Sequence, residues 1–102
     1  MTIQKARCWK SMSDIRVIHE PGGDELDSMG VFDWPIWEKE VSEFPWKYES
    51  QETCYVLEGE VVVTPDEGVA VTIKAGDLAI FPSGMSCRWD VRIPIRKHYS
   101  FE

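Results

Sequence analysis

Cysteine and histidine, the side chains typical of zinc sites and of nucleophilic catalysis, are sparse in this sequence. The chain has three cysteines, Cys8, Cys54 and Cys87, and two histidines, His19 and His98. Three widely spaced cysteines do not suggest a disulfide framework, so a reducing compartment is expected. The sequence contains no CxxC or HxxxH spacing. A zinc finger and a three-histidine metal site are therefore excluded.

The elements that must position these side chains are expected to be strands. From Trp34 onward, short segments rich in Val, Ile, Thr and aromatic residues recur at intervals of about ten residues, a spacing typical of a barrel or sandwich. The expected strands are residues 14–19, 34–40, 46–48, 53–57, 60–64, 69–73, 78–81, 86–91 and 95–101. The turns expected from Gly, Pro and Asp are residues 58–59, 65–68, 75–77 and 82–84.

The segment PIWEKEVSEF, residues 35–44, fits two structures. Its apolar residues fall near a helical stripe, which would make it an amphipathic helix. It also alternates as a strand, with Ile36, Glu38 and Glu40 on one face. The strands expected around it favour the second interpretation.

The chain is expected to have two parts. Residues 1–30 are predicted to form an N-terminal arm, with the strand at 14–19 followed by turns at 21–30, and this arm packs on a barrel. Residues 31–102 are predicted to form the barrel itself.

Length and charge exclude several classes of protein. The 102 residues fit one compact domain and leave no room for a second. A net charge of -7 repels the phosphates of nucleic acids and anionic lipids. No apolar run approaches the ~20 residues of a membrane span, and the acidic residues near the N-terminus argue against a targeting segment. We expect a cytoplasmic protein that binds neither nucleic acid nor membrane.

Two motifs resemble those of the cupin superfamily. Residues 52–59, ETCYVLEG, look like the end of the first cupin motif, and residues 76–84, GDLAIFPSG, look like the second. Either motif alone is a weak signal, but the pair is specific. The resemblance implies an all-β fold, a single-domain cupin jelly-roll β-barrel with a pocket at one mouth. The surrounding sequence resembles the small cupins classed with the ureidoglycine aminohydrolase cupin domain.

The same resemblance implies that most of the usual metal ligands have been replaced. Glu52 matches the ligand glutamate, and Cys87 stands at the position of the third histidine. The two upstream histidines are replaced by Trp46 and Tyr48. An alignment shifted by one residue places Pro45 and Lys47 there, and neither is a better ligand.

A carboxylate and a thiolate are competent metal ligands, but two protein ligands rarely hold a divalent ion tightly. A third ligand, such as His98 or a substrate atom, would be needed. We therefore expect no cofactor, and a divalent metal is the less favoured alternative.

Alternation along the strands and the cupin alignment together indicate a site. Glu52 and Cys87 are expected to face the barrel interior as the catalytic pair, with Trp46, Tyr48 and Trp89 binding the substrate. The structural alternatives are an ion pair of Glu52 with Lys97 or Arg96, or a cap on a turn amide by the Glu52 carboxylate, and a role for Cys87 as a small buried hydrophobe.

The last strand can face the pocket in two ways. Alternation sends either Lys97 and Tyr99 or Arg96 and His98 inward, and the sequence leaves both open. Lys97 and Tyr99 are included among the expected substrate-binding residues.

The expected function is that of a small-molecule-binding cupin. The leading hypothesis is an enzyme that acts on a small nitrogenous metabolite, as the ureidoglycine aminohydrolase resemblance implies, with Glu52 as acid or base. Two alternatives stay open: a non-catalytic ligand-binding or sensor cupin, and a structural barrel whose own aromatic residues fill the pocket. A homodimer is expected from the resemblance, burying some of Trp34, Trp37 and Tyr55.

Overall fold

The computed structural model describes residues 15–102, so Cys8 and most of the expected N-terminal arm lie outside the described residues. The elements of the described part are β1 (Arg16–His19), α2 (Gly23–Met29), the 3-10 helix η1 (Val31–Asp33), β2 (Ile36–Lys39), β3 (Ser42–Lys47), β4 (Glu52–Pro65), β5 (Val71–Lys74), β6 (Asp77–Phe81) and β7 (Ser86–Phe101). The fold is all-β, as expected, with short helices confined to the region before β2.

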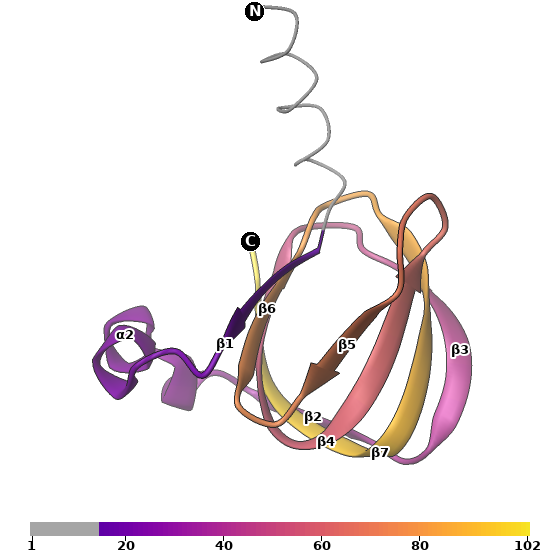
Figure 1. Ribbon diagram of the computed structural model, residues 1–102. Coiled ribbons are helices and arrows are strands. Elements are labelled where there is room, and N and C mark those ends of the chain that lie inside the picture. Colours follow the sequence, from indigo (N-terminus) through magenta and orange to yellow (C-terminus); the bar gives the residue numbers. More distant parts are fainter. Residues whose placement is uncertain (1–14) are drawn as a thin grey trace, which may run out of the picture.

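The strands form one antiparallel sheet that curves into a barrel (Figure 1). Its strand order is β1-β6-β4-β7-β2, while β3 also pairs with β7 and β5 also pairs with β4. The two long strands β4 and β7 pair from Glu52 opposite Phe101 to Pro65 opposite Cys87. These two strands therefore form the centre of the sheet. They also provide Glu52 and Lys97, the charged side chains of the barrel interior described below.

The prediction of a turn at Glu58-Gly59 is wrong. The chain continues as one strand, β4, and its pairing with β7 shifts register between Val56 and Val61. Gly59 has a φ of 97°, a left-handed conformation that glycine adopts without steric cost. The glycine therefore forms a bulge, which bends a long strand without ending it. The two strands expected at 86–91 and 95–101 are likewise one strand, β7, which pairs with β4 on both sides of the residues between them.

The ambiguous segment 35–44 forms strands, not a helix. β2 and the beginning of β3 occupy it, and both pair with β7. β3 begins at Ser42, earlier than the strand expected at 46–48. The pairing places Trp37 opposite Lys97 and Phe44 opposite Trp89, which brings these four residues onto neighbouring strands.

The arm contains a helix where turns were predicted. The part of its expected strand that is described forms β1, which pairs with β6. A hydrogen bond joins His19 at the end of β1 to the buried Asp77, with 2.8 Å between Nδ1 and Oδ1. Residues 23–29, however, form α2, with acidic residues in its first turn and Gly30 in a left-handed C-cap. Both features stabilise a helix, because they complement the helix dipole and satisfy its last carbonyls.

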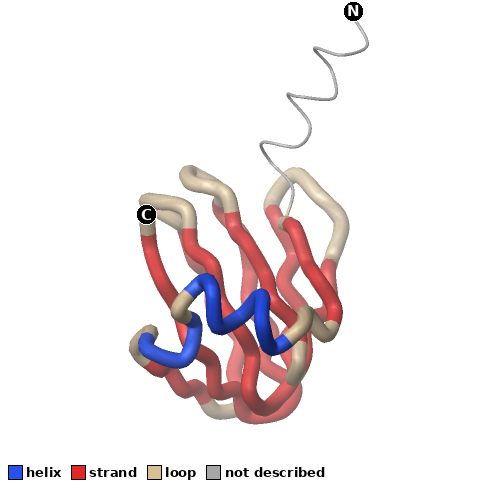
Figure 2. The backbone as a smooth tube through the Cα atoms, turned by 90° about the vertical axis from the view of Figure 1, so that its left-hand side faces the viewer, coloured by secondary structure: helices blue, strands red, loops and turns tan. Residues whose placement is uncertain are grey.

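Two hydrophobic cores lie on opposite faces of the sheet. The larger one fills the barrel interior and includes residues of β4, β6 and β7 such as Val61, Phe81 and Val91. The smaller one lies under α2 and η1, which cover the outside of the strands (Figure 2), and is centred on Leu26, Val31 and Leu78. None of the helices described is long and apolar enough to cross a membrane.

Candidate functional site

A cavity of about 150 Å³ opens from the barrel interior. Nine residues from β2, β3, β4, β7 and the segment after β3 line it: Trp37, Phe44, Trp46, Tyr48, Glu52, Trp89, Lys97, Tyr99 and Phe101. Seven of the nine are aromatic, and Glu52 and Lys97 are the two charged ones. Trp46 and Phe101 are about half exposed, so the cavity reaches solvent beside these two rings.

Glu52 and Lys97 form a buried ion pair within this cavity. The Lys97 Nζ donates to the Glu52 Oε2 over 2.6 Å, and the two side chains are 5% and 4% exposed. Burying either charge alone would be strongly unfavourable, so each side chain depends on the other. The pair places a hydrogen-bond donor and an acceptor side by side in an otherwise aromatic cavity.

Two indole rings hold the Lys97 ammonium from the sides. Its Nζ lies 4.6 Å from the centre of the Trp89 ring and 4.9 Å from that of Trp37. The negative face of an aromatic ring attracts a cation at this distance, and most strongly where water is excluded. Trp89 in turn stacks on Phe44, with 6.1 Å between ring centres. The position of the ammonium is therefore fixed from three directions.

Tyr48 and Trp89 form the polar part of the aromatic wall. The Trp89 indole nitrogen donates to the Tyr48 hydroxyl oxygen over 3.1 Å, and Tyr48 stacks on Phe81 at 4.8 Å. Burial, followed by the negative charge of Glu52, raises the pKa of Tyr48 well above its ordinary value of 10.0. The hydroxyl therefore keeps its proton, which it can donate to an acceptor in the cavity.

Both cysteines in the described part of the chain are buried and free. Burial, followed by the charge of Asp66, raises the pKa of the Cys87 thiol to about 11. Burial also raises the pKa of the Cys54 thiol to about 11, although the positive charge of Lys97 acts to lower it. Because the thiolate is the nucleophile, these environments favour an unreactive thiol at neutral pH.

Six of the seven side chains expected at the site line the cavity together: Trp46, Tyr48, Glu52, Trp89, Lys97 and Tyr99. Cys87 is buried in the barrel core and does not line it. The structure also settles the orientation of the last strand in favour of Lys97 and Tyr99. His98 lies on the outer face, where its Nδ1 is 2.9 Å from the Trp34 carbonyl oxygen.

Sequence reasoning missed three lining residues, Trp37, Phe44 and Phe101. Trp37 is among the residues expected at a dimer interface, yet it contacts the ammonium of Lys97. Its position directly opposite Lys97 in the β2–β7 ladder is the signal that would have found it. Strand register cannot be read from the sequence, because several alignments of two strands keep the same alternation.

The cavity residues do not fit a divalent metal ion. The carboxylate of Glu52 is engaged by an ammonium, and the positions upstream of it carry the side chains of Trp46 and Tyr48, which are not metal ligands of the usual kind. Among residues 15–102, no group of three or more His, Cys, Asp or Glu side chains is placed to hold a metal ion.

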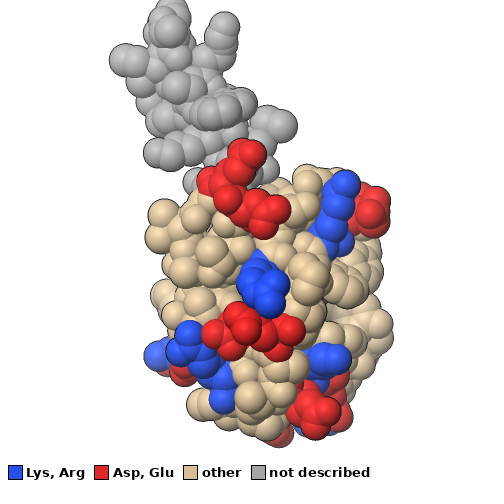
Figure 3. Space-filling view, turned by 90° about the vertical axis from the view of Figure 1, so that its right-hand side faces the viewer, with Lys and Arg blue, Asp and Glu red and all other residues tan. Residues whose placement is uncertain are grey.

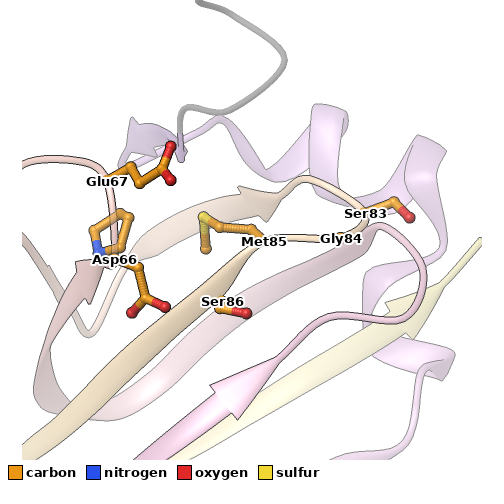
Figure 4. Close-up of a pocket in the computed structure, with 7 residues that line it drawn as sticks. Asp66, Glu67, Ser83, Gly84, Met85 and Ser86 are labelled. Carbon is orange, nitrogen blue, oxygen red and sulfur yellow. The ribbon is translucent and has the colours of Figure 1, made fainter.

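A second hollow of about 320 Å³ lies between two turns (Figure 4). The turn residues 65–67 and 83–86 line it, and Asp66 and Glu67 are exposed carboxylates at its edge. It shares no residue with the aromatic cavity. Its two charged residues are exposed, whereas the aromatic cavity holds the buried pair of Glu52 and Lys97. The aromatic cavity is therefore the better candidate for a ligand site.

The curled antiparallel sheet with a cavity in its interior, together with the motifs at residues 52–59 and 76–84, is that of a cupin. More narrowly, the chain belongs to the family of EutQ-like cupin domains, whose family model matches residues 26–99.

Solved structures agree with this assignment. A DUF861 family protein from Thermotoga maritima is 48% identical, with a TM-score of 0.84 over 87% of this chain and 100% of that one. A putative ethanolamine utilization protein Q from Salmonella typhimurium LT2 is 33% identical, with a TM-score of 0.58. The Clostridium difficile EutQ protein is 26% identical, with the same score. The last two matches cover 63% of this chain and about half of each relative, 51% and 50%. No curated protein matches the chain.

Proposed function

We propose that this cupin binds a small organic molecule in the aromatic cavity, with Lys97 and Glu52 as its polar contacts. The observation that carries the proposal is the buried 2.6 Å ion pair inside a cavity that reaches solvent. A mostly apolar cavity with a few convergent polar groups is the usual form of a small-molecule site. The aromatic rings supply contact area, and the ion pair supplies orientation.

The cavity is best suited to a neutral, planar ligand of the amide or ureide class. The charges of Glu52 and Lys97 cancel, so neither a cation nor an anion gains a net attraction. An amide presents a carbonyl acceptor beside an N–H donor, which complements the Lys97 ammonium, the Tyr48 hydroxyl and the Glu52 carboxylate. The flat faces of the group can lie against the indole and phenyl rings. This ligand class fits a small nitrogenous metabolite.

An enzymatic activity on such a ligand would rest on Glu52. Its carboxylate is the basic group in the cavity and lies beside the acceptor-binding ammonium, so it can take a proton from a bound N–H group while Lys97 and Tyr48 hold the carbonyl. This geometry supports an acid–base role and assigns no direct role to Cys87, which does not line the cavity. The alternative is a non-catalytic binding or sensor domain that uses the same contacts without turnover.

A different observation favours the second candidate, a barrel closed by its own side chains. Tyr48 stacks on Phe81, Phe44 stacks on Trp89, and Trp37 packs edge to face on both Phe44 and Trp89. If these rings already fill the interior, no ligand enters and the ion pair is purely structural. The two candidates predict different results for ligand titration.

The experiment is a titration of the full chain with simple primary amides and substituted ureas, followed by tryptophan fluorescence and calorimetry. Carboxylates and amines of matched shape are the comparison ligands. Binding of the amides is expected, with weakening in Lys97→Met and in Trp46→Ala. The control is Phe32→Ala, which removes a half-exposed ring of η1 outside the cavity and should leave affinity unchanged. Loss of turnover in Glu52→Gln with retained binding would identify an enzyme.

No response to any ligand class, together with loss of stability alone in the variants, would favour the self-filled barrel.

A homodimer remains a prediction. Of the residues expected at its interface, Trp37 lines the cavity, while Trp34 and Tyr55 pack against the cluster under α2 and η1.

A further inference from the structure

We infer that the Lys97 ammonium is the resident cation of this cavity and holds the place beside Glu52 that a divalent metal ion takes in metal-binding cupins. Glu52 stands at the ligand glutamate of the cupin motif, so in that pattern its carboxylate faces a metal ion. Here it faces the Nζ of Lys97. The inference concerns the cation itself and holds whether or not the cavity proves to bind an amide.

The charge balance of the cavity supports this assignment. A carboxylate as buried as Glu52 requires a positive partner, and Lys97 supplies one within the same chain. Among residues 15–102, no other hydrogen bond forms to the Glu52 carboxylate. The ammonium therefore neutralises the one acid that lines the cavity, and no second cation is needed for charge balance.

The surroundings of Lys97 hold its ammonium in place as ligands hold a metal ion. Lys97 pairs with Val56, further along β4 than Glu52 and on the same face, and its side chain runs along the barrel interior to reach the carboxylate. The Trp37 and Trp89 rings lie 4.9 and 4.6 Å from its Nζ. One oxygen and two ring faces thus surround the charge, and Trp37 is fixed there by its register with Lys97.

This arrangement opposes metal binding and changes what the site can do. A divalent ion on Glu52 would lie within a few ångströms of the ammonium, and like charges repel strongly where water is excluded. An ammonium attracts and orients an acceptor oxygen through its hydrogen bonds, as a Lewis acid does through coordination. It has no open coordination position, so it cannot bind and activate a water molecule as a metal ion does.

The test measures the response of the protein to manganese alone, because Mn²⁺ prefers oxygen ligands and avoids the thiols. Thermal unfolding midpoints and bound metal after dialysis are compared for the wild type, Glu52→Gln, Lys97→Met and the double variant Glu52→Gln/Lys97→Met. The wild type should retain no stoichiometric Mn²⁺, and its midpoint should not change with millimolar Mn²⁺. Lys97→Met should unfold at a lower temperature, and Mn²⁺ should raise that midpoint by replacing the lost cation.

The double variant is the matched control, because it removes both charges while keeping the side-chain shapes. It should be more stable than Lys97→Met and should not respond to Mn²⁺. Stoichiometric Mn²⁺ in the wild type that is lost in Glu52→Gln would overturn the inference, and this comparison does not require Lys97→Met to fold. An equal rise of the midpoint with Mn²⁺ in Lys97→Met and in the double variant would also overturn it, because the metal would then bind elsewhere. Absence of any rise in Lys97→Met would overturn it as well, because Mn²⁺ would then fail to take the place of the ammonium.

Discussion

The Trp89 indole donates a hydrogen bond to the Tyr48 hydroxyl across 3.1 Å, in a wall of the barrel where both side chains are buried. The bond joins β7 to the segment that follows β3. It keeps the Trp89 ring edge-on to Tyr48 and leaves the face of that ring for the Lys97 ammonium. The shape of the cavity therefore depends on a pair of residues that carry no charge.

Tyr48→Phe should remove the acceptor for the Trp89 N–H without changing the shape of the wall. A buried donor left without a partner costs about 1–3 kcal/mol, so the free energy of unfolding should fall by this amount. Urea unfolding followed by circular dichroism measures it. The control is Tyr55→Phe, because no hydrogen bond of the Tyr55 hydroxyl forms within the part of the chain that the structure describes. Equal losses in the two variants would show that the Tyr48–Trp89 bond contributes nothing specific.

The Glu52–Lys97 pair should show strong energetic coupling. Removal of one partner leaves the other charge buried and alone, so Lys97→Met and Glu52→Gln should each lower the free energy of unfolding by about 3–5 kcal/mol. The double variant should lose much less than the sum of the two. A double-mutant cycle in urea measures this coupling.

The exposed pair Arg96–Glu38 is the reference for this cycle, with 3.1 Å between its charged atoms. Water screens these charges, so its coupling should be at most about 1 kcal/mol. Couplings of similar size for the two pairs would mean that Glu52 and Lys97 are as well hydrated as a surface pair. Figure 3 shows acidic and basic side chains next to one another on the face of the barrel that carries β3, and the exposed pair of Arg88 with Glu43 of β3 is of the same kind.

Gly59→Ala should be among the most damaging single substitutions in the barrel. A Cβ at this position would lie 2.2 Å from the Pro94 carbonyl oxygen, and the φ of 97° is unfavourable for alanine. Backbone strain alone costs about 1–3 kcal/mol, and the clash adds to it. We expect loss of soluble, folded protein in an expression and thermal-shift assay.

Gly84→Ala separates these two causes. Gly84 has a φ of 84°, but nothing lies within 4 Å of an added Cβ. This variant should therefore carry the strain without the clash and remain folded at a reduced midpoint. If Gly59→Ala is no worse than Gly84→Ala, the bulge in β4 can move away from Pro94.

The buried thiols should make the protein less stable at alkaline pH. The pKa values of Cys54 and Cys87 rise from 9.0 to about 11 on folding, so the unfolded chain loses these protons at lower pH. Their contribution is complete below pH 9 and is lost as the pH rises from 9 towards 11. Urea midpoints across this range should decrease, and Cys54→Ala/Cys87→Ala should flatten the decrease.

The same thiols should be unreactive in the native state. In a Cys8→Ser background, Ellman's reagent should modify Cys54 and Cys87 slowly at pH 8 and rapidly in urea. Fast modification of Cys87 in the folded protein would restore it as a candidate nucleophile.

Local patterns predicted much of the barrel. Most strands and the turns at 65–68, 75–77 and 82–84 form where Gly, Pro and Asp interrupt the apolar segments. The local sequence pattern gave a wrong prediction where the same residues are compatible with two backbone structures. Gly59 is compatible with a hairpin turn and with a bulge, and pairing of β4 with β7 on both sides of it decides for the bulge. Residues 21–30 resemble turns until Leu26 is buried against Val31 and Leu78, which stabilises α2.

The sequence by itself determined the cupin fold and four of the nine cavity residues, Trp46, Tyr48, Glu52 and Trp89, because the motif spacing and strand alternation are local properties of the chain. Only the tertiary structure decided that Lys97 and Tyr99 face inward, that Lys97 neutralises Glu52, and that Trp37 belongs to the site. It also placed Cys87 outside the cavity. The physical reason is register: sliding β7 by one residue against β4 would reverse every one of its side chains while leaving the sequence pattern unchanged.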